Sequence, residues 1–189
     1  MTLLKHFAEF GEYVEITGFS NVQIENVEGF LKATRREQQG TAVQFFNAEL
    51  VATWQHLYFV VLNALTAFRN KTNVSKSVAV EVILYASAQR QIRKAIELLG
   101  VKRDSDTVAV VIIAMSSHAV KAALSKVSKR IGSEPDETVL ALSNAKIRSI
   151  SRAFSISERE VETIVKAGNV EQALVDLVVE RVALLATQL

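Results

Sequence analysis

The 189-residue sequence contains no cysteine, one proline and seven glycines. The missing cysteine excludes thiolate catalysis, disulfide bonds and cysteine-ligated metal sites. It also excludes the disulfide-rich secreted class of proteins, so we expect an intracellular, cytoplasmic protein. Because so few residues interrupt regular structure, the elements are expected to be long and mostly helical.

A hydrophobic run long enough to cross a membrane is also missing. The longest, Val51–Phe68, contains Gln55, His56, Asn63 and Thr66, whereas a span needs about 20 predominantly apolar residues. The first fifteen residues lack the basic region, apolar run and cleavage site of a signal peptide. We therefore expect no membrane partner. An apolar fraction of 49% excludes wholesale disorder.

The patterning predicts an α/β fold, with a small mixed β-sheet covered by long helices and with additional C-terminal helices. Most residues are expected to be helical. Strands are predicted at 13–19, 41–46 and 107–114, and the last is continuously apolar, as is typical of a central strand. Helices are predicted at 27–39, 48–69, 77–99, 116–131, 135–154, 157–168 and 170–186.

Two regions are expected, with a boundary at Gly132–Pro135. Residues 1–132 would form an α/β layer that carries a basic motif. Residues 133–189 would form helices packed on the same domain. Cap residues support several helix starts: Asn26, Ser157 with Glu160 as a capping box, and Asn169.

Positive charge is concentrated in the middle of the chain. Residues 71–132 hold 11 basic and 4 acidic residues, a net charge of +7, whereas residues 1–70 have a net charge of −2 and residues 133–189 of −3. A basic block between acidic flanks points to a polyanionic partner. A solvated helix surface is the alternative.

Residues arranged for catalysis are not found. His6, His56 and His118 have no metal-ligand spacing, and neither phosphate-binding glycine motif, G-x-x-x-x-G-K-[ST] or G-x-G-x-x-G, occurs. His56 lies on a mostly apolar segment, so we expect a hydrogen-bonded core residue. We predict no catalytic residue, no cofactor and no metal.

The segment Asn70–Ser77 carries the most information about binding. It places Lys71 and Lys76, with several hydroxyl groups, just before a predicted helix. Unpaired N–H groups and the helix dipole attract anions at such a position. The alternative is simple capping by Ser75 or Ser77, with both lysines solvated.

A carboxylate follows within the apolar first turn of that helix. Glu81 must be paired or lie at an edge, and Lys71 and Lys76 are the local candidates for a partner. It would either orient a basic site or form an ordinary salt bridge. Further basic residues are Arg90, Arg93 and Lys94, where Arg93 can pair with Glu97, and a second basic helix holds Lys121, Lys126, Lys129 and Arg130.

These residues carry a resemblance to a known family. The stretch Ala67–Ser77 continues through Glu81, Leu84–Ser87 and Arg90–Ile92. It resembles the signature of the CGI/TPRKB-type subunit of the KEOPS (EKC) complex, in its archaeal form. The resemblance covers roughly residues 12–131, and residues 133–189 contain no matching motif.

The resemblance implies a non-catalytic, regulatory subunit of a complex that installs threonylcarbamoyl on an adenosine beside the anticodon of certain tRNAs. Such a subunit binds and stimulates the small atypical kinase/ATPase subunit, and it grips the single-stranded 3′ CCA end of tRNA. No small-molecule substrate is expected. The matched RNA-binding residues are Lys71, Thr72, Asn73, Lys76, Ser77, Arg90 and Gln91, and Lys94 is added from the basic surface of the same predicted helix.

The kinase partner is expected to bind an apolar stripe of the last predicted helix. Leu174, Leu177, Val178 and Arg181 recur there at i, i+3, i+4 and i+7, and core packing is the alternative. Two other functions stay open. One is a small-ligand-binding protein or enzyme with an anion site at Asn70–Ser77, and the other is a structural bridge without RNA affinity.

Overall fold

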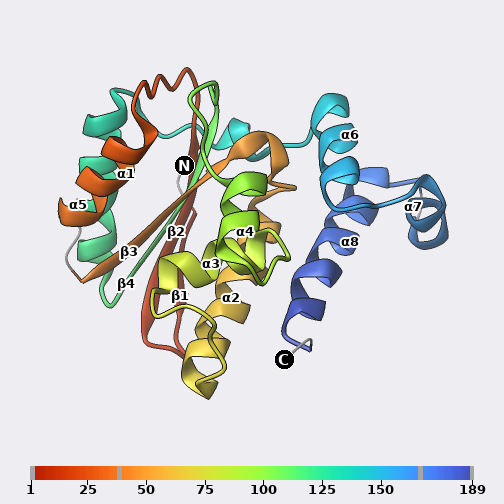
Figure 1. The fold of residues 1–189 in the computed structure, drawn as a ribbon, viewed down its shortest axis with the longest axis horizontal. Coiled ribbons are helices and arrows are strands. Elements are labelled where there is room, and N and C mark those ends of the chain that lie inside the picture. Colours follow the sequence, from red (N-terminus) through yellow and green to blue (C-terminus); the bar gives the residue numbers. More distant parts are fainter. Residues whose placement is uncertain (1–2, 38–39, 166–167, 188–189) are drawn as a thin grey trace. The chain divides into compact units, whose positions relative to one another are not determined.

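The computed structural model describes residues 3–37, 40–165 and 168–187 (Figure 1). Contacts between Cα atoms divide it into two compact units, each built from two stretches of chain. The first unit is Met1–Ala48 with Gly100–Val139, and the second is Glu49–Leu99 with Leu140–Leu189. The domain organisation expected from the sequence, with helices after residue 132 packed on one domain, stays a prediction.

The first unit contains a four-stranded sheet in the order β1-β2-β4-β3. All three strand pairings are antiparallel, so the α/β class is confirmed but the predicted mixed sheet is wrong. The strands β2 and β3 run in the same direction, yet β4 lies between them and opposes both. The edge strand β1 was not predicted. The strands are β1 (Leu3–Phe7), β2 (Glu12–Phe19), β3 (Thr41–Asn47) and β4 (Val108–Ala114).

The strand β4 lies inside the sheet, as its sequence predicts. Each of its seven residues is buried. Val108, Val110 and Ile112 join one core cluster with Phe45 of β3 and Phe19 of β2. Burial on both faces explains why the strand is continuously apolar instead of alternating.

Two helices, α1 (Val27–Glu37) and α5 (Ser117–Ile131), lie on one face of this sheet (Figure 1). Asn26 caps α1 as predicted, since its Oδ1 accepts from the backbone N–H of Gly29 at 2.8 Å. Helix α5 packs Val120, Ala123 and Val127 into the core cluster. The predicted last residues of α1, 38 and 39, lie outside the described residues.

The chain after α5 passes close to β2. The backbone N–H of Asp136 donates to the carbonyl of Gly18 at 2.7 Å, and the Ser20 hydroxyl donates to the Asp136 carboxylate at 2.8 Å. The predicted helix over 135–154 is therefore wrong. A short 3₁₀ helix, η2 (Glu137–Leu140), comes first, and α6 (Asn144–Ala153) begins only where the Ser143 side chain caps it.

The second unit is built from helices. Helix α2 contacts α3 and α8, and α3 also contacts α4. The predicted start of α2 at residue 48 is wrong, because Thr53 caps it by accepting from the N–H of Gln55. No helix in the described ranges is long and apolar enough to cross a bilayer. The elements are η1 (Ala48–Leu50), α2 (Trp54–Asn70), α3 (Val78–Ala86), α4 (Ile92–Leu99), α6, α7 (Glu158–Ile164) and α8 (Val170–Leu185).

The single helix predicted over 77–99 is divided into α3 and α4. Ala88 adopts a left-handed conformation with φ of 49°. Its N–H donates to the carbonyl of Tyr85, and the N–H of Gln89 donates to the carbonyl of Leu84. This is the Schellman pattern that ends helices, in which glycine is usual at the left-handed position. The same pattern ends α2 at Lys71 and α6 at Ser155.

His56 occupies the core of the second unit, as predicted. Its Nδ1 accepts from the N–H of Ala52 at 3.3 Å, so its Nε2 donates to the carbonyl of Ala86 at 3.0 Å. The ring meets Phe154 edge-on, with centroids 5.7 Å apart. Burial lowers the pKa of His56 to about 4, and the charge of Lys146 acts in the same direction.

The predicted caps of the C-terminal helices are confirmed. Ser157 and Glu160 form a complete capping box at the start of α7. The Asn169 side chain accepts from the N–H of Gln172 at the start of α8.

Candidate nucleic-acid interface

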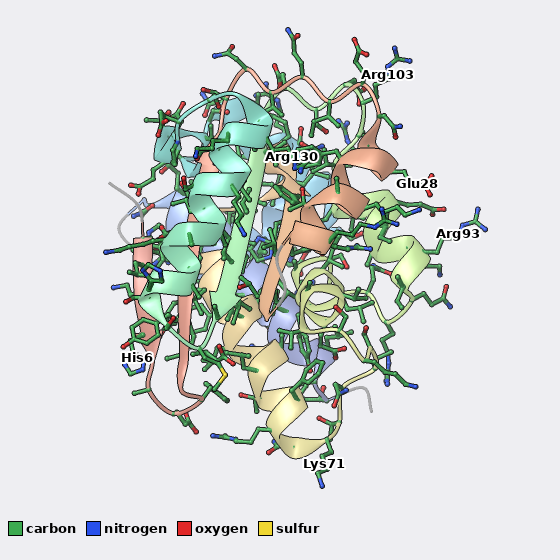
Figure 2. The ribbon with its side chains drawn as sticks, turned by 90° about the vertical axis from the view of Figure 1, so that its left-hand side faces the viewer. His6, Glu28, Lys71, Arg93, Arg103 and Arg130 are labelled. Atoms are coloured by element: carbon green, nitrogen blue, oxygen red, sulfur yellow. The ribbon has the colours of Figure 1, made fainter. Side chains whose placement is uncertain are left out.

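The loop between α2 and α3 presents two lysines to solvent. Lys71 lies at the left-handed end of α2, with φ of 58°, and its side chain points away from the helix end (Figure 2). Lys76 is exposed five residues later. Neither lysine joins an ion pair within the part of the chain that the structure describes. Both ammonium groups are therefore available to an outside anion.

A buried carboxylate fixes the backbone of this loop. Glu81 is 2% exposed, and its two oxygens accept from the N–H groups of Val74 at 3.2 Å and Ser75 at 2.8 Å. The predicted pairing of Glu81 with Lys71 or Lys76 is therefore wrong. Instead, the carboxylate binds two backbone N–H groups, and a hydrogen bond to a charged acceptor is stronger than one to a neutral acceptor.

Side chains of the loop complete its internal hydrogen bonding. The Asn73 amide donates to the carbonyl of Ser75 at 2.9 Å, and the Ser75 hydroxyl accepts from the N–H of Ser77 at 3.1 Å. Ser77 is the N-cap residue of α3, but its hydroxyl forms no capping bond. The exposed Ser77 hydroxyl is therefore free of the capping role that the sequence suggested.

The turn between α3 and α4 carries the next predicted residues. Arg90 and Gln91 are exposed in this turn and Lys94 is exposed on α4, so they do not follow one continuous helix as predicted. Burial and the negative charge of Glu81 raise the pKa of Tyr85, and the positive charge of Arg90 opposes them. Arg90 therefore lies near Tyr85, at the C-terminal end of α3.

The loop and the turn meet at a shallow depression. Thr72 and Arg90 both line it, together with Glu81, Tyr85 and Leu185. Its volume is about 10 Å³, whereas pockets for small molecules hold about 300–1,000 Å³. The surface can therefore contact an extended ligand but does not enclose a metabolite.

All eight predicted RNA-binding residues lie in the second unit, within residues 71–94. Thr72 and Arg90 are brought together at the depression, whereas Lys94 lies beyond it on α4. Arg93 pairs with Glu97 at 2.8 Å, as predicted, and points outward (Figure 2). Tyr85 and Leu185 were not predicted as site residues. The spacing could have indicated Tyr85, because it lies one helical turn after Glu81.

The predicted partner-binding stripe is mostly core. Leu174, Leu177 and Val178 are at most 4% exposed, since α8 packs against α2 and α3. Arg181 forms an ion pair with Glu160. These three apolar side chains are therefore not available to a partner, and core packing, the alternative, is correct.

A different helix exposes large apolar side chains. Trp54 is 40% and Phe59 is 38% exposed on α2. Tyr58 joins them, with ring centroids 6.2 Å from Trp54 and 5.5 Å from Phe59. This aromatic patch of three residues was not predicted from the sequence.

Comparisons with known proteins agree on one family. Residues 19–186 match the family model described as "Kinase binding protein CGI-121". The chain is also similar to "Regulatory protein Cgi121" of the archaeon Methanocaldococcus jannaschii. The two are 33% identical over 117 residues, which cover 62% of this chain and 72% of the relative.

Proposed function

The chain belongs to the CGI-121 family of kinase-binding proteins, and from this premise we propose that it is a non-catalytic regulatory subunit of a KEOPS complex. In this role it binds the small atypical kinase/ATPase subunit and the 3′ CCA end of tRNA. It thereby supports the modification of tRNA with threonylcarbamoyl-adenosine.

One observation supports the RNA part of the proposal most directly. Glu81 holds the loop backbone through the N–H groups of Val74 and Ser75, so Lys71 and Lys76 lie on a fixed loop and have no acidic partner among the residues that the structure describes. Lysines held in this way bind phosphate without first losing an ion pair. Ser77, Arg90 and Gln91 are exposed in the same loop and the following turn, and Asn73 is half-buried there, so their side chains can add polar contacts to a bound strand.

The same geometry argues against the small-ligand alternative. The N–H groups of Val74 and Ser75, which would receive an anion before α3, are already occupied by the carboxylate of Glu81. The depression beside them, at about 10 Å³, has room for about one water molecule. Stabilisation of the protein by nucleotides or sugar phosphates in the absence of RNA would favour this alternative.

Binding of tRNA with and without its CCA end tests the RNA function. Affinity should fall when the CCA end is removed, and the double substitution Lys71→Glu with Lys76→Glu should weaken binding by about tenfold or more. The matched control is Lys102→Glu with Arg103→Glu, which reverses two exposed charges in the first unit. Binding should also weaken steeply as salt rises. Unchanged affinity after both the trimming and the lysine substitutions would exclude CCA recognition by this loop.

The aromatic patch of α2 is the surface proposed for the kinase subunit. Exposed tryptophan and tyrosine are enriched among the residues that dominate protein interfaces, and the family is named for kinase binding. Trp54→Ala with Phe59→Ala should abolish co-purification with the kinase subunit. The control pair, Ile92→Ala with Ile96→Ala, removes two exposed isoleucines of α4 and should leave it intact. The reverse result would move the docking surface to α4.

A further inference from the structure

Helix α5 of the first unit has a strong excess of positive charge. It carries Lys121, Lys126, Lys129 and Arg130, and no aspartate or glutamate. Lys121 and Lys129 are exposed, and among the described residues neither of them takes part in an ion pair. Lys129 and Arg130 lie in the last turn, where positive charge favours the helix dipole. This effect does not account for Lys121, which lies about one turn after the N-terminus of the helix.

An open groove runs along this helix. Its volume is about 550 Å³, and the polar residues of its lining are Lys121, Ser125, Ser128, Lys129, Ser133 and Glu134. Lys121, Ser125 and Ser128 recur at i, i+4 and i+7, so they form one stripe on the helix surface. Two lysines against one glutamate give the lining a net positive charge.

The spacing of the two exposed lysines suits a nucleic-acid backbone. At 1.5 Å of rise per residue, Lys121 and Lys129 are separated by about 12 Å along the helix axis. One strand of a DNA duplex carries a phosphate about every 3.4 Å of axis, so on that scale the two lysines are separated by about three to four phosphate spacings. The two lysines can therefore contact different phosphates of one strand.

The lining distinguishes paired from unpaired RNA. It contains no aromatic side chain among its described residues, and recognition of single strands depends on stacking of bases on aromatic rings. A duplex instead keeps its bases stacked inside and offers phosphates and 2′-hydroxyls. Lysine ammonium groups and serine hydroxyls complement these two groups.

We infer that the α5 groove is a second RNA-binding surface, which takes the sugar-phosphate backbone of an RNA duplex without reading its sequence. The choice of RNA over other polyanions rests on the proposed tRNA function. The groove is formed by residues of the first unit, whereas the loop of residues 70–77 belongs to the second.

Two labelled RNAs test this inference: a blunt 14-base-pair duplex and a short single strand that ends in CCA. Lys121→Glu with Lys129→Glu should weaken duplex binding about tenfold or more, and the milder Lys121→Gln with Lys129→Gln should lower the slope of log Kd against log salt by about 2. Neither Lys71→Glu with Lys76→Glu nor the Lys102→Glu with Arg103→Glu control should change duplex binding. A DNA duplex of the same sequence should bind more weakly, since it lacks the 2′-hydroxyl.

The outcomes separate this inference from the proposed function. Loss of single-strand binding on substitution of Lys71 and Lys76, with duplex affinity absent or indifferent to α5, would overturn the inference and leave the proposed function standing. Duplex binding that depends on α5, without any binding of the CCA strand, would support the inference and overturn the proposed function. Equal affinity for the RNA and DNA duplexes would overturn the assignment to RNA.

Discussion

The carboxylate of Glu81 accepts a hydrogen bond of 2.8 Å from the backbone N–H of Ser75, so a buried charge on α3 fixes the loop before its own helix. Its other oxygen accepts from the N–H of Val74. The loop therefore combines a hydrogen-bonded backbone with solvent-exposed lysine side chains. This division explains how a loop rich in polar residues can be a preorganised surface.

Replacing this carboxylate by an amide should disorder the loop. In Glu81→Gln one backbone N–H faces an NH₂ group in place of an oxygen, so we expect a loss of about 1–3 kcal/mol of unfolding free energy. Hydrogen exchange at Val74 and Ser75 should accelerate, and RNA affinity should fall although every lysine is retained. Glu97→Gln is the control, because it removes only an exposed pair with Arg93. Unaltered exchange at both amides would contradict the role given to Glu81.

Replacing Lys71 by glycine should raise the stability of the protein and lower its affinity for RNA. Its left-handed φ of 58° is unfavourable for a residue with a Cβ, and glycine is the usual residue at this position. Lys71→Gly should therefore raise the unfolding free energy by about 1 kcal/mol while RNA affinity falls. Ser155→Gly, at the equivalent end of α6, should raise stability and leave RNA binding unchanged. If Lys71→Gly lost stability, the left-handed conformation would not be the strained feature described.

The helix ends show where sequence reasoning succeeds and fails. Asn26, Ser157 and Asn169 each accept from the N–H group three residues later. Because this capping rule is local, it can be applied to the sequence alone. Helices α2 and α3 end at Lys71 and Ala88, in a left-handed conformation that usually belongs to glycine. No residue type in the sequence marks these two helix ends. The sequence therefore showed α3 and α4 as one helix, and it placed Arg90 on that helix instead of in a turn.

The candidate site was located by its charges but not by its partners. Lys71 and Lys76 were found because basic residues before a helix are conspicuous in a sequence. The sequence could not show that Glu81 binds backbone N–H groups instead of lysine ammonium groups, because every residue except proline carries the same backbone donor. Leu174 and Val178 show the same limit, because an apolar stripe on a helix is typical of core and interface alike.

The close approach at Gly18 predicts a sensitive position in the sheet. A Cβ there would lie 2.8 Å from the Cβ of Val139 and 2.9 Å from the carbonyl oxygen of Asp136. Gly18→Ala should therefore cost about 1–3 kcal/mol of stability through overpacking. Ser20→Ala removes only the hydrogen bond to Asp136 and should cost about 0.5–1.5 kcal/mol. Chemical denaturation measures both, and a Gly18→Ala protein as stable as the wild type would mean that the segment 136–139 does not pass this close to β2.

The buried ring of His56 predicts a dependence of stability on pH. Its pKa is about 4 in the folded protein instead of the ordinary 6.5, so between these values the unfolded chain binds a proton that the folded chain does not. The stability that the folded protein owes to a neutral His56 is fully present above pH 6.5. It is lost as the pH falls toward 4, by roughly 3 kcal/mol of unfolding free energy in total.

The substitution His56→Gln removes this titration while keeping a donor for the carbonyl of Ala86. The variant should be less stable at pH 8, because the N–H of Ala52 loses its acceptor. Its deficit relative to the wild type should stay constant down to pH 6.5 and then shrink as the pH falls, since only the wild type carries the penalty of protonating a buried imidazole. Denaturation midpoints of both proteins from pH 8 to pH 4.5 measure this difference. A constant deficit over the whole range would show that His56 can take up its proton in the folded protein as readily as in the unfolded chain.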